Sequence, residues 1–245
     1  MNIRYLLLEA RITLRNIRFS VFTIVMPAVL FLIYCGLWAG KGAAYPDGTP
    51  VTASLMVSMA GYGAMGAAMS TGAQIAFERG IGWQRQLRLT PLSGIGYMLA
   101  KGALAMLMAL PCIVIVSILG VIRGVELDAG QWLTATGGLW LAVTPFAVLG
   151  IMIGMFASPD SLQPIISGSM MALGLLGGMW IPAAVAPEWM RNIMKVTPTY
   201  WLQEVGRSAF APKATLGVAL AVLGGYALLT GLLAARRYVT DAVRV

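Results

Sequence analysis

Hydrophobic and polar residues occur along this chain in long blocks rather than at the short period of a soluble helix or strand. Six stretches of more than 20 residues contain no Asp, Glu, Lys or Arg. A helix needs about 20 mainly apolar residues to cross the hydrocarbon core of a bilayer. Since lipid offers no hydrogen-bond partner to an exposed backbone, these stretches are expected to be helices. They predict six membrane-spanning helices, at 19–40, 53–77, 102–122, 132–156, 164–181 and 214–235.

Three segments outside these blocks carry most of the charge. In 1–18 the apolar residues recur at helical spacing while the arginines fall mostly on the opposite side, which is typical of an amphipathic helix lying along the membrane surface. The connection 78–101 mixes charged and apolar residues, which indicates either a short helix beneath the membrane or an ordinary basic loop. The stretch 182–213 indicates either two short helices that dip into the outer leaflet or a surface linker with aromatic anchors. The predicted fold class is an all-α integral membrane protein with a single transmembrane domain over 1–245.

The distribution of charge predicts the orientation of the chain. The sequence is 59% hydrophobic and 11% charged, with a formal net charge of +8. If six helices span the membrane and both termini are cytoplasmic, eleven of the 17 Lys and Arg residues lie inside and six outside. Short cytoplasmic loops carry an excess of Lys and Arg, so this orientation is favoured. Basic flanks of membrane helices explain the high isoelectric point without a nucleic-acid partner.

The composition also excludes several kinds of chemistry. The chain contains no histidine, which rules out histidine-based metal sites, histidine general bases and Ser-His triads. Its carboxylates lie outside the predicted spans, and Asp160 sits in a short inner turn, which disfavours a proton-driven carrier or a carboxylate-ringed channel. No phosphate-binding G-x-x-x-x-G-K-[ST] loop is present. The chain is therefore expected not to be an enzyme, to bind no cofactor, and to take its energy from another protein.

Small and polar residues inside the spans indicate how the helices pack. Glycines at short spacing allow close approach of neighbouring helices, and these are Gly36, Gly40, Gly63, Gly66, Gly72, Gly150, Gly154, Gly174 and Gly178. The polar residues at membrane depth have two interpretations, either hydrogen bonds between helices or the lining of a substrate path. The candidates for a path are Gln74, Thr144, Ser167 and Ser169.

Two motif regions together resemble a known family, the membrane (permease) subunits of type-2 ABC transporters. In the inner connection the resemblance rests on Glu78, Gly82, Arg85, Leu87, Thr90, Pro91, Leu92 and Lys101. In the outer stretch it rests on Gly177, Gly178, Pro182, Pro187, Trp189, Pro198 and Trp201. The amphipathic first segment and the six-span layout fit this family as well, so the resemblance covers nearly the whole chain.

The resemblance implies a pair of permeases bound to two copies of a separate ABC ATPase, which would hold ATP and Mg²⁺. The segment after Glu78 would be a coupling helix in a cleft of that ATPase, and Glu78 could pair with one of its arginines. The turn at Asp160 would be a second, smaller contact. The residues expected to couple to the ATPase are Glu78, Arg79, Gly82, Arg85, Arg88, Thr90, Pro91 and Asp160.

The outer stretch is expected to cap the exit of a transport path. Pro182 and Pro187 are expected to end the fifth helix, and the tryptophans suit a membrane interface. The expected cap residues are Pro182, Pro187, Trp189, Pro198 and Trp201.

The sequence thus predicts the transmembrane subunit of an ATP-driven exporter in a bacterial plasma membrane. Its substrate would be an amphipathic or lipophilic small molecule such as a drug, an antibiotic, a peptide or a lipid, and antibiotic resistance is one role that fits. Whether the second permease is an identical or a related chain stays open. The alternative is a membrane immunity protein that sequesters a toxin without transport. An intramembrane lipid enzyme is disfavoured because clustered catalytic residues are missing.

Overall fold

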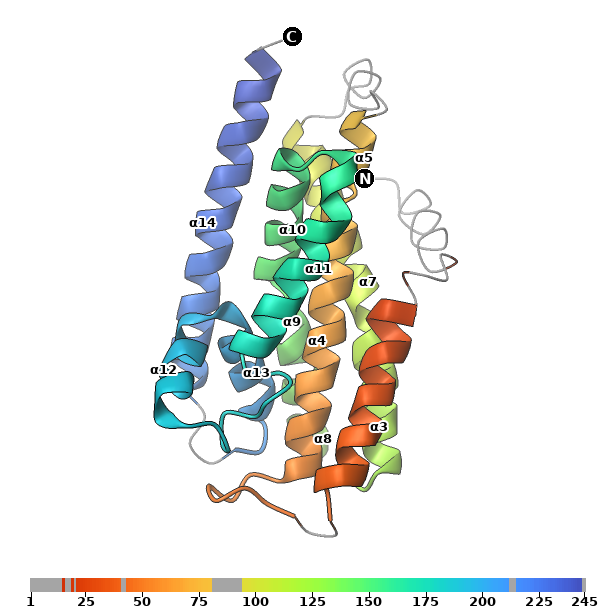
Figure 1. Cartoon of the computed structure of the whole chain (residues 1–245), viewed down its shortest axis with the longest axis vertical. Helices are drawn as coiled ribbons and strands as arrows, with labels where there is room; N and C mark the ends of the chain where they lie inside the picture. The colour runs from red at the N-terminus through yellow and green to blue at the C-terminus, as the bar shows by residue number, and fades with distance from the viewer. Residues whose placement is uncertain are drawn as a thin grey trace.

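The computed structural model describes residues 15, 19, 21–40, 43–80, 94–211 and 215–243. Within these ranges the chain is helical apart from its turns and one isolated β-bridge between Ala44 and Pro50. The long helices run side by side along one axis (Figure 1). Of the predicted surface segment 1–18 only Arg15 is among the described residues.

The elements follow one another in this order. The first half contains the π-helix η1 (Val21–Val25), α3 (Met26–Trp38), α4 (Val51–Ala73), α5 (Ile75–Gly80) and α7 (Gly94–Ile122). An irregular stretch follows, with α8 (Ala129–Trp132), the π-helix η2 (Leu133–Gly138), α9 (Leu139–Ala142) and α10 (Thr144–Phe156). The chain ends with α11 (Pro159–Leu176), α12 (Glu188–Val196), α13 (Pro198–Arg207) and α14 (Leu216–Val243).

Four helical stretches of the described chain are long and apolar enough to cross a membrane. They are Val51–Gly80, Gly96–Ile122, Ala129–Phe156 and Leu216–Arg237, and they coincide with the predicted second, third, fourth and sixth spans. The predicted first span corresponds to a shorter apolar helix, Thr23–Trp38. The predicted fifth span corresponds to α11, which has an acidic first turn. The all-α membrane fold is confirmed, while the count of six spans stays a prediction.

Several helix ends differ from the predicted boundaries. α11 ends at Leu176 and not near 181, because Gly178 has a φ of +79°, a left-handed conformation that glycine adopts without strain. The amide of Met179 then donates to the carbonyl of Gly174 and closes the turn. Glycine rather than Pro182 therefore ends this helix, which corrects the expectation. At the other end of the molecule α7 begins at Gly94, so the last part of the predicted connection 78–101 belongs to a long helix.

Proline acts differently in the predicted third and fourth spans, where it is expected to kink the helix axis. α7 continues through Pro111 as one helix, whereas the fourth span is broken into α8, η2, α9 and α10, with Pro145 in the first turn of α10. Proline at the start of a helix sacrifices no hydrogen bond, because the first amides have no intrahelical partner. In the fourth span the helix is thus broken near its proline.

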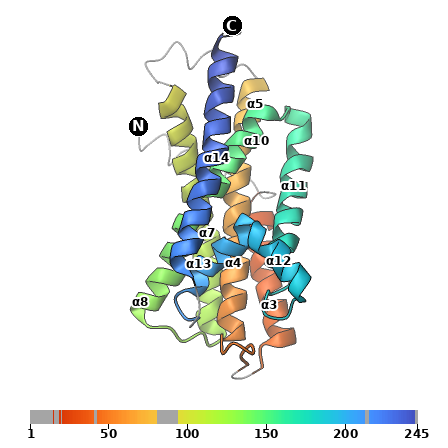
Figure 2. The ribbon, with the colours of Figure 1, turned by 90° about the vertical axis from the view of Figure 1, so that its left-hand side faces the viewer.

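The helix α4 lies at the centre of the bundle (Figures 1 and 2). In the most apolar 18-residue part of Val51–Gly80, which covers α4 and α5, 94% is buried. The corresponding value for α14 is 22%. The helices α3, α7, α10, α11 and α13 all pack against α4. In a bilayer α14 therefore presents most of its surface to lipid, and α4 contacts almost only protein.

Glycine makes the contact between α4 and α10 close enough for backbone to touch backbone. A Cβ atom added to Gly150 would lie 2.3 Å from the carbonyl oxygen of Met69, and one added to Gly72 would lie 2.7 Å from that of Ala147. Gly154 meets Ala73 in the same way, at 2.9 Å. Tight packing through these glycines is confirmed. The pair Gly36 and Gly40 differs, because an added Cβ there would meet no described atom within 4 Å.

Replacing Gly150 with Ala is expected to destabilise the permease. The added methyl group meets backbone, which cannot turn away as a side chain can, so the cost should reach or exceed the usual overpacking cost of about 1–3 kcal/mol. Thermal unfolding of the detergent-purified chain measures the effect. Gly224→Ala on α14, where an added Cβ would likewise meet no described atom within 4 Å, is the matched control, and its unfolding temperature should stay unchanged or rise slightly because alanine favours helix. Equal unfolding temperatures for both variants would contradict the proposed contact.

Candidate functional site

The end of the bundle that the sequence predicts to be cytoplasmic holds a buried charged cluster, and we call it the inner end. The carboxylate of Glu78, on α5, lies 2.5 Å from the Nζ of Lys101 on α7. Its other oxygen accepts a hydrogen bond from the hydroxyl of Tyr97. We call Glu78, Tyr97 and Lys101 the inner cluster. It joins α5 to α7, the helices that flank residues 81–93 in the sequence.

Local sequence explains how these three side chains meet. Tyr97 and Lys101 are four residues apart, so they lie on the same face of α7. The chain turns at Gln74, between α4 and α5, where its amide bonds to the carbonyl of Thr71. Lys101 is only 2% exposed. A buried ammonium is costly without a partner, so the carboxylate of Glu78 is what makes the position of Lys101 tolerable.

The residues next to the inner cluster tie it to a second inner turn. A guanidinium nitrogen of Arg79 donates to the carbonyl oxygens of Gly154 and Met155, in the last turn of α10. These carbonyls have no intrahelical partner, and a cation there complements the helix dipole. At Gly80 an added Cβ would lie 2.8 Å from Pro159, the first residue of α11. The turn that carries Asp160 therefore sits directly beside the end of α5.

The structure describes three of the eight residues expected to couple to an ATPase. Glu78 and Arg79 belong to α5, and Asp160 is exposed in the first turn of α11. Both oxygens of Glu78 bond to its own chain, although the family resemblance implied an arginine of the ATPase as partner. The other five lie outside the described residues, namely Gly82, Arg85, Arg88, Thr90 and Pro91.

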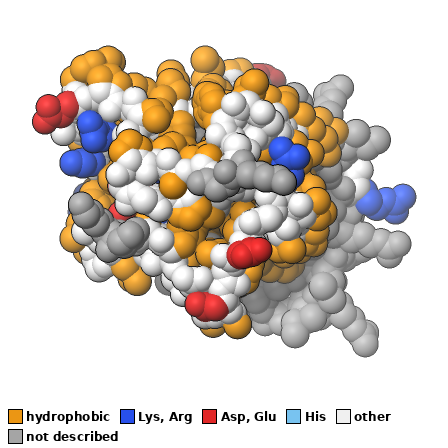
Figure 3. Space-filling model, turned by 90° about the horizontal axis from the view of Figure 1, so that it is seen from below, with side chains coloured by type: hydrophobic (Ala, Val, Ile, Leu, Met, Phe, Trp, Pro, Cys, Tyr) orange, Lys and Arg blue, Asp and Glu red, His pale blue; other side chains and the backbone are white. Residues whose placement is uncertain are grey.

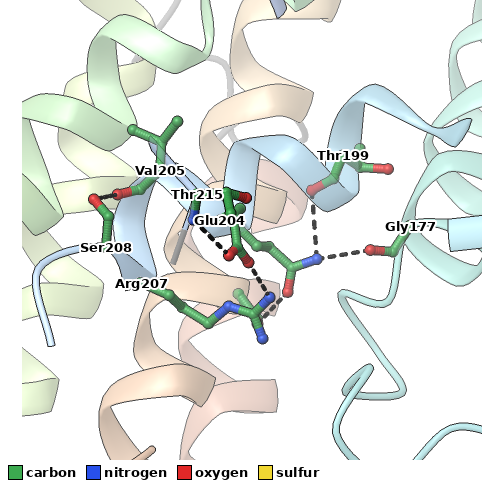
Figure 4. A network of polar contacts seen from close by, with 9 residues as sticks. Gly177, Thr199, Glu204, Val205, Arg207, Ser208 and Thr215 are labelled. Atoms are coloured by element: carbon green, nitrogen blue, oxygen red, sulfur yellow. Dashed lines mark hydrogen bonds and ion pairs between the residues drawn. The ribbon is translucent and has the colours of Figure 1, made fainter. Parts of the chain in front are cut away.

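The opposite, outer half of the bundle contains a polar network on α13 (Figure 4), to which Gln203 contributes hydrogen bonds. The side-chain oxygen of Gln203 accepts a hydrogen bond of 2.6 Å from Ser58 on α4, and its nitrogen donates over 2.7 Å to the carbonyl of Gly177. One turn earlier, Thr199 donates over 2.8 Å to the carbonyl of Leu173. Both carbonyls belong to the C-terminal end of α11. We call Ser58, Thr199 and Gln203 the outer network, which fastens α13 to α4 and α11.

Glu204 extends this attachment to the last helix. One oxygen of Glu204 lies 2.8 Å from a guanidinium nitrogen of Arg207, and the other accepts from the amide of Thr215, just before α14. The hydroxyl of Tyr45 in the outer loop is buried without a hydrogen-bond partner among the described residues. Burial raises the pKa of Tyr45, and the charge of Arg207 opposes that rise. The loop, α13 and α14 thus meet around Arg207.

The expected exit-cap residues occupy different positions in this outer region. Pro182 is buried, Pro187 precedes α12, and Pro198 begins α13. The indole of Trp201 donates over 2.7 Å to the carbonyl of Lys195 and fixes the end of α12, whereas Trp189 is 67% exposed. Pro187 and Pro198 thus mark the starts of α12 and α13, and Trp201 is half-buried where Trp189 is exposed.

The four residues proposed for a substrate path do not form one group. Thr144 donates to the carbonyl of Leu141 and contacts the sulfur of Met106 on α7. Ser167, on the exposed side of α11, accepts a hydrogen bond of 3.2 Å from Gln163. Ser169 is half-buried on the same helix, and Gln74 is half-buried at the turn between α4 and α5. Thr144 and Ser167 are exposed, and they lie on different helices, α10 and α11.

These features define the class of the protein. A bundle in which four helices of the described chain are long and apolar enough to cross a bilayer is that of an integral membrane protein. The sequence profile of the ABC-2 type transporter family matches residues 5–211, and the chain belongs to this family. A relative in Bacillus subtilis (strain 168), "Putative transport permease YvfS", is 29% identical over 196 residues, which are 78% of each chain. The chain is thus a transmembrane transporter subunit rather than an enzyme, and its family works with an ABC ATPase.

Sequence reasoning missed several of these residues. Tyr97, Ser58, Thr199, Gln203 and Glu204 were not singled out. A weak signal was present, since Tyr97 and Lys101, like Thr199 and Gln203, are polar residues four apart in mainly apolar surroundings. Their partners come from distant parts of the chain, and no local pattern reveals them.

Removing one member of the inner cluster should destabilise the permease more than removing both charges. Glu78→Gln removes the carboxylate that faces the buried ammonium of Lys101, and breaking a buried ion pair from one side costs about 3–5 kcal/mol. The double variant Glu78→Leu with Lys101→Leu removes both charges, and it should unfold close to the wild-type temperature. Thermal unfolding in detergent measures both, with Asp160→Asn as an exposed control. A double variant that is less stable than Glu78→Gln would contradict the ion pair.

Proposed function

We propose that the chain is the membrane subunit of an ATP-driven exporter, with six spans, both termini cytoplasmic and a location in a bacterial plasma membrane. Two permeases would bind two copies of a separate ABC ATPase, which would hold ATP and Mg²⁺. The single observation that carries this proposal is the inner cluster. It joins α5 to α7, the two helices that flank residues 81–93 in the sequence, so a force on that segment would reach both helices.

The proposed role of Glu78 is to hold this segment within its own chain. Its oxygens bond to Lys101 and Tyr97, so the contact with the ATPase falls to the basic residues that follow. Arg85 and Arg88 supply positive charge there, and Asp160 adds a second contact from the adjacent turn. Charge-assisted contacts of this kind suit an interface that transmits motion.

The proposed partner permease would cover α3 and α11, which lie on the same side of α4 (Figures 1 and 2). The exposed side of α11 carries Gln163, Ser167 and Gly168, and Gly168, like Gly36 on α3, would meet nothing within 4 Å if a Cβ were added. Polar side chains at membrane depth face protein or a water-filled path, and small residues allow another helix to approach.

The same face supports an amphipathic or lipophilic substrate. On α11 exposed Met171 lies one turn beyond the polar pair Gln163 and Ser167, on the same face. A path between two such faces would offer hydrogen bonds and adaptable apolar contacts together. Drugs, antibiotics, peptides and lipids all fit this description. We infer export because α12 and α13 close the outer end while the ATPase acts at the inner end.

A pull-down of the tagged chain from its native membrane tests the proposal. A protein with a Walker phosphate loop should co-purify at near one copy per permease. Reversing both charges, with Arg85→Glu and Arg88→Glu, should reduce the recovered ATPase at least about tenfold, since two contacts of about 1 kcal/mol or more are replaced by repulsion. The control Arg123→Glu changes a basic residue at the outer end and should recover the ATPase normally. Absence of any ATPase in several mild detergents would instead favour a sequestering immunity protein.

A further inference from the structure

The helix α12 has three distinct faces. Met190 and Met194 point to the bundle, and Met194 is fully buried. Trp189, Ile193 and Val196, spaced four and three residues apart, share a second face, and they are 67%, 43% and 70% exposed. Arg191 and Lys195, four residues apart, form an exposed third face. Within the described chain neither of these two cations forms an ion pair or a side-chain hydrogen bond.

The position of α12 places these faces at the boundary of the bilayer. The hydroxyl of Tyr226 donates over 2.5 Å to the carbonyl of Val196. Tyr226 lies ten residues after the start of α14 at Leu216, which is about 15 Å along the helix axis, and its side chain leans back toward the start of α14. The end of α12 therefore lies beside the first half of a helix that is long and apolar enough to span a membrane, a position where an exposed apolar face is suited to contact acyl chains.

Two further contacts hold α12 in this orientation. Trp201 bonds to the carbonyl of Lys195 while Tyr226 bonds to that of Val196, so both α13 and α14 fix its C-terminal end. Glu188 lies in the first turn of α12, where the helix dipole favours an acidic residue. Figure 3 shows basic side chains next to hydrophobic ones at the edge of the molecule where α12 lies. The two cations are thus presented at a fixed place beside an apolar surface.

We propose that α12 is a binding surface for anionic phospholipids, in which Arg191 and Lys195 contact headgroup phosphates while Trp189, Ile193 and Val196 contact the acyl chains. An interfacial helix with a basic face and an apolar face bearing Trp has this preference. Each Lys or Arg near an anionic lipid surface contributes about 1 kcal/mol. The inference goes beyond the proposed transport function and needs neither a substrate nor an ATPase.

Quenching of Trp189 by brominated lipid tests this proposal. The full chain is placed in nanodiscs that contain either brominated phosphatidylglycerol or brominated phosphatidylcholine at equal mole fraction. The contribution of Trp189 is the difference between the wild type and Trp189→Phe. At low salt, brominated phosphatidylglycerol should quench Trp189 more strongly, and high salt should reduce the difference because it screens exposed charges.

Each cation removed should weaken the preference for phosphatidylglycerol about fivefold. The double variant Arg191→Gln with Lys195→Gln should therefore lose this selectivity. Arg123→Gln, which removes a cation outside α12, should keep it. Equal quenching by both lipids in the wild type, or selectivity that survives in the double variant, overturns the proposal. Absence of quenching by either lipid overturns it as well, since α12 then lies outside the bilayer. None of these results depends on ATPase binding, so they leave the proposed transport function to its own test.

Discussion

The backbone contact between α4 and α10 is the constraint on which the rest of the fold depends. Lipid gives helices no hydrophobic reason to associate, so their packing relies on close approach and on hydrogen bonds. Gly72, Gly150 and Gly154 remove the side chains that would keep the two helices apart. Neighbouring helices enclose α4. Polar residues near its two ends therefore meet fixed hydrogen-bond partners on those helices.

Both polar sites are attached to this central helix. Toward the inner end, α4 continues through the turn at Gln74 into α5, which carries Glu78 of the inner cluster. In the outer half, Ser58 bonds to Gln203 of the outer network. Polar groups at membrane depth need hydrogen-bond partners within the protein. This requirement ties α7 to one end of α4, and it ties α11 and α13 to the other end. A movement of α5 and α7 would therefore displace α4 and, through the hydrogen bond between Ser58 and Gln203, α13 as well.

The sequence alone predicted the parts of this structure that depend on local composition. Charge-free runs located four full spans, and the glycine content of the second span indicated its close packing. The end of α11 was wrong because Gly178 adopts a left-handed turn before Pro182 is reached. The partners of Glu78 and Gln203 could not be predicted, since each bond joins segments brought together only by folding.

The central claim is that the inner cluster transmits ATP-driven motion through the bundle to its outer end. Leu176, exposed at the end of α11, can be replaced with Cys and labelled by an impermeant maleimide in membranes that contain the permease and its ATPase. Cys35 and Cys112 are buried, so the introduced thiol should dominate the signal. We predict that ATP with vanadate changes the labelling rate several-fold in the wild-type background and leaves it unchanged in the Glu78→Leu, Lys101→Leu double variant. An equal response to ATP in both backgrounds would contradict the claim.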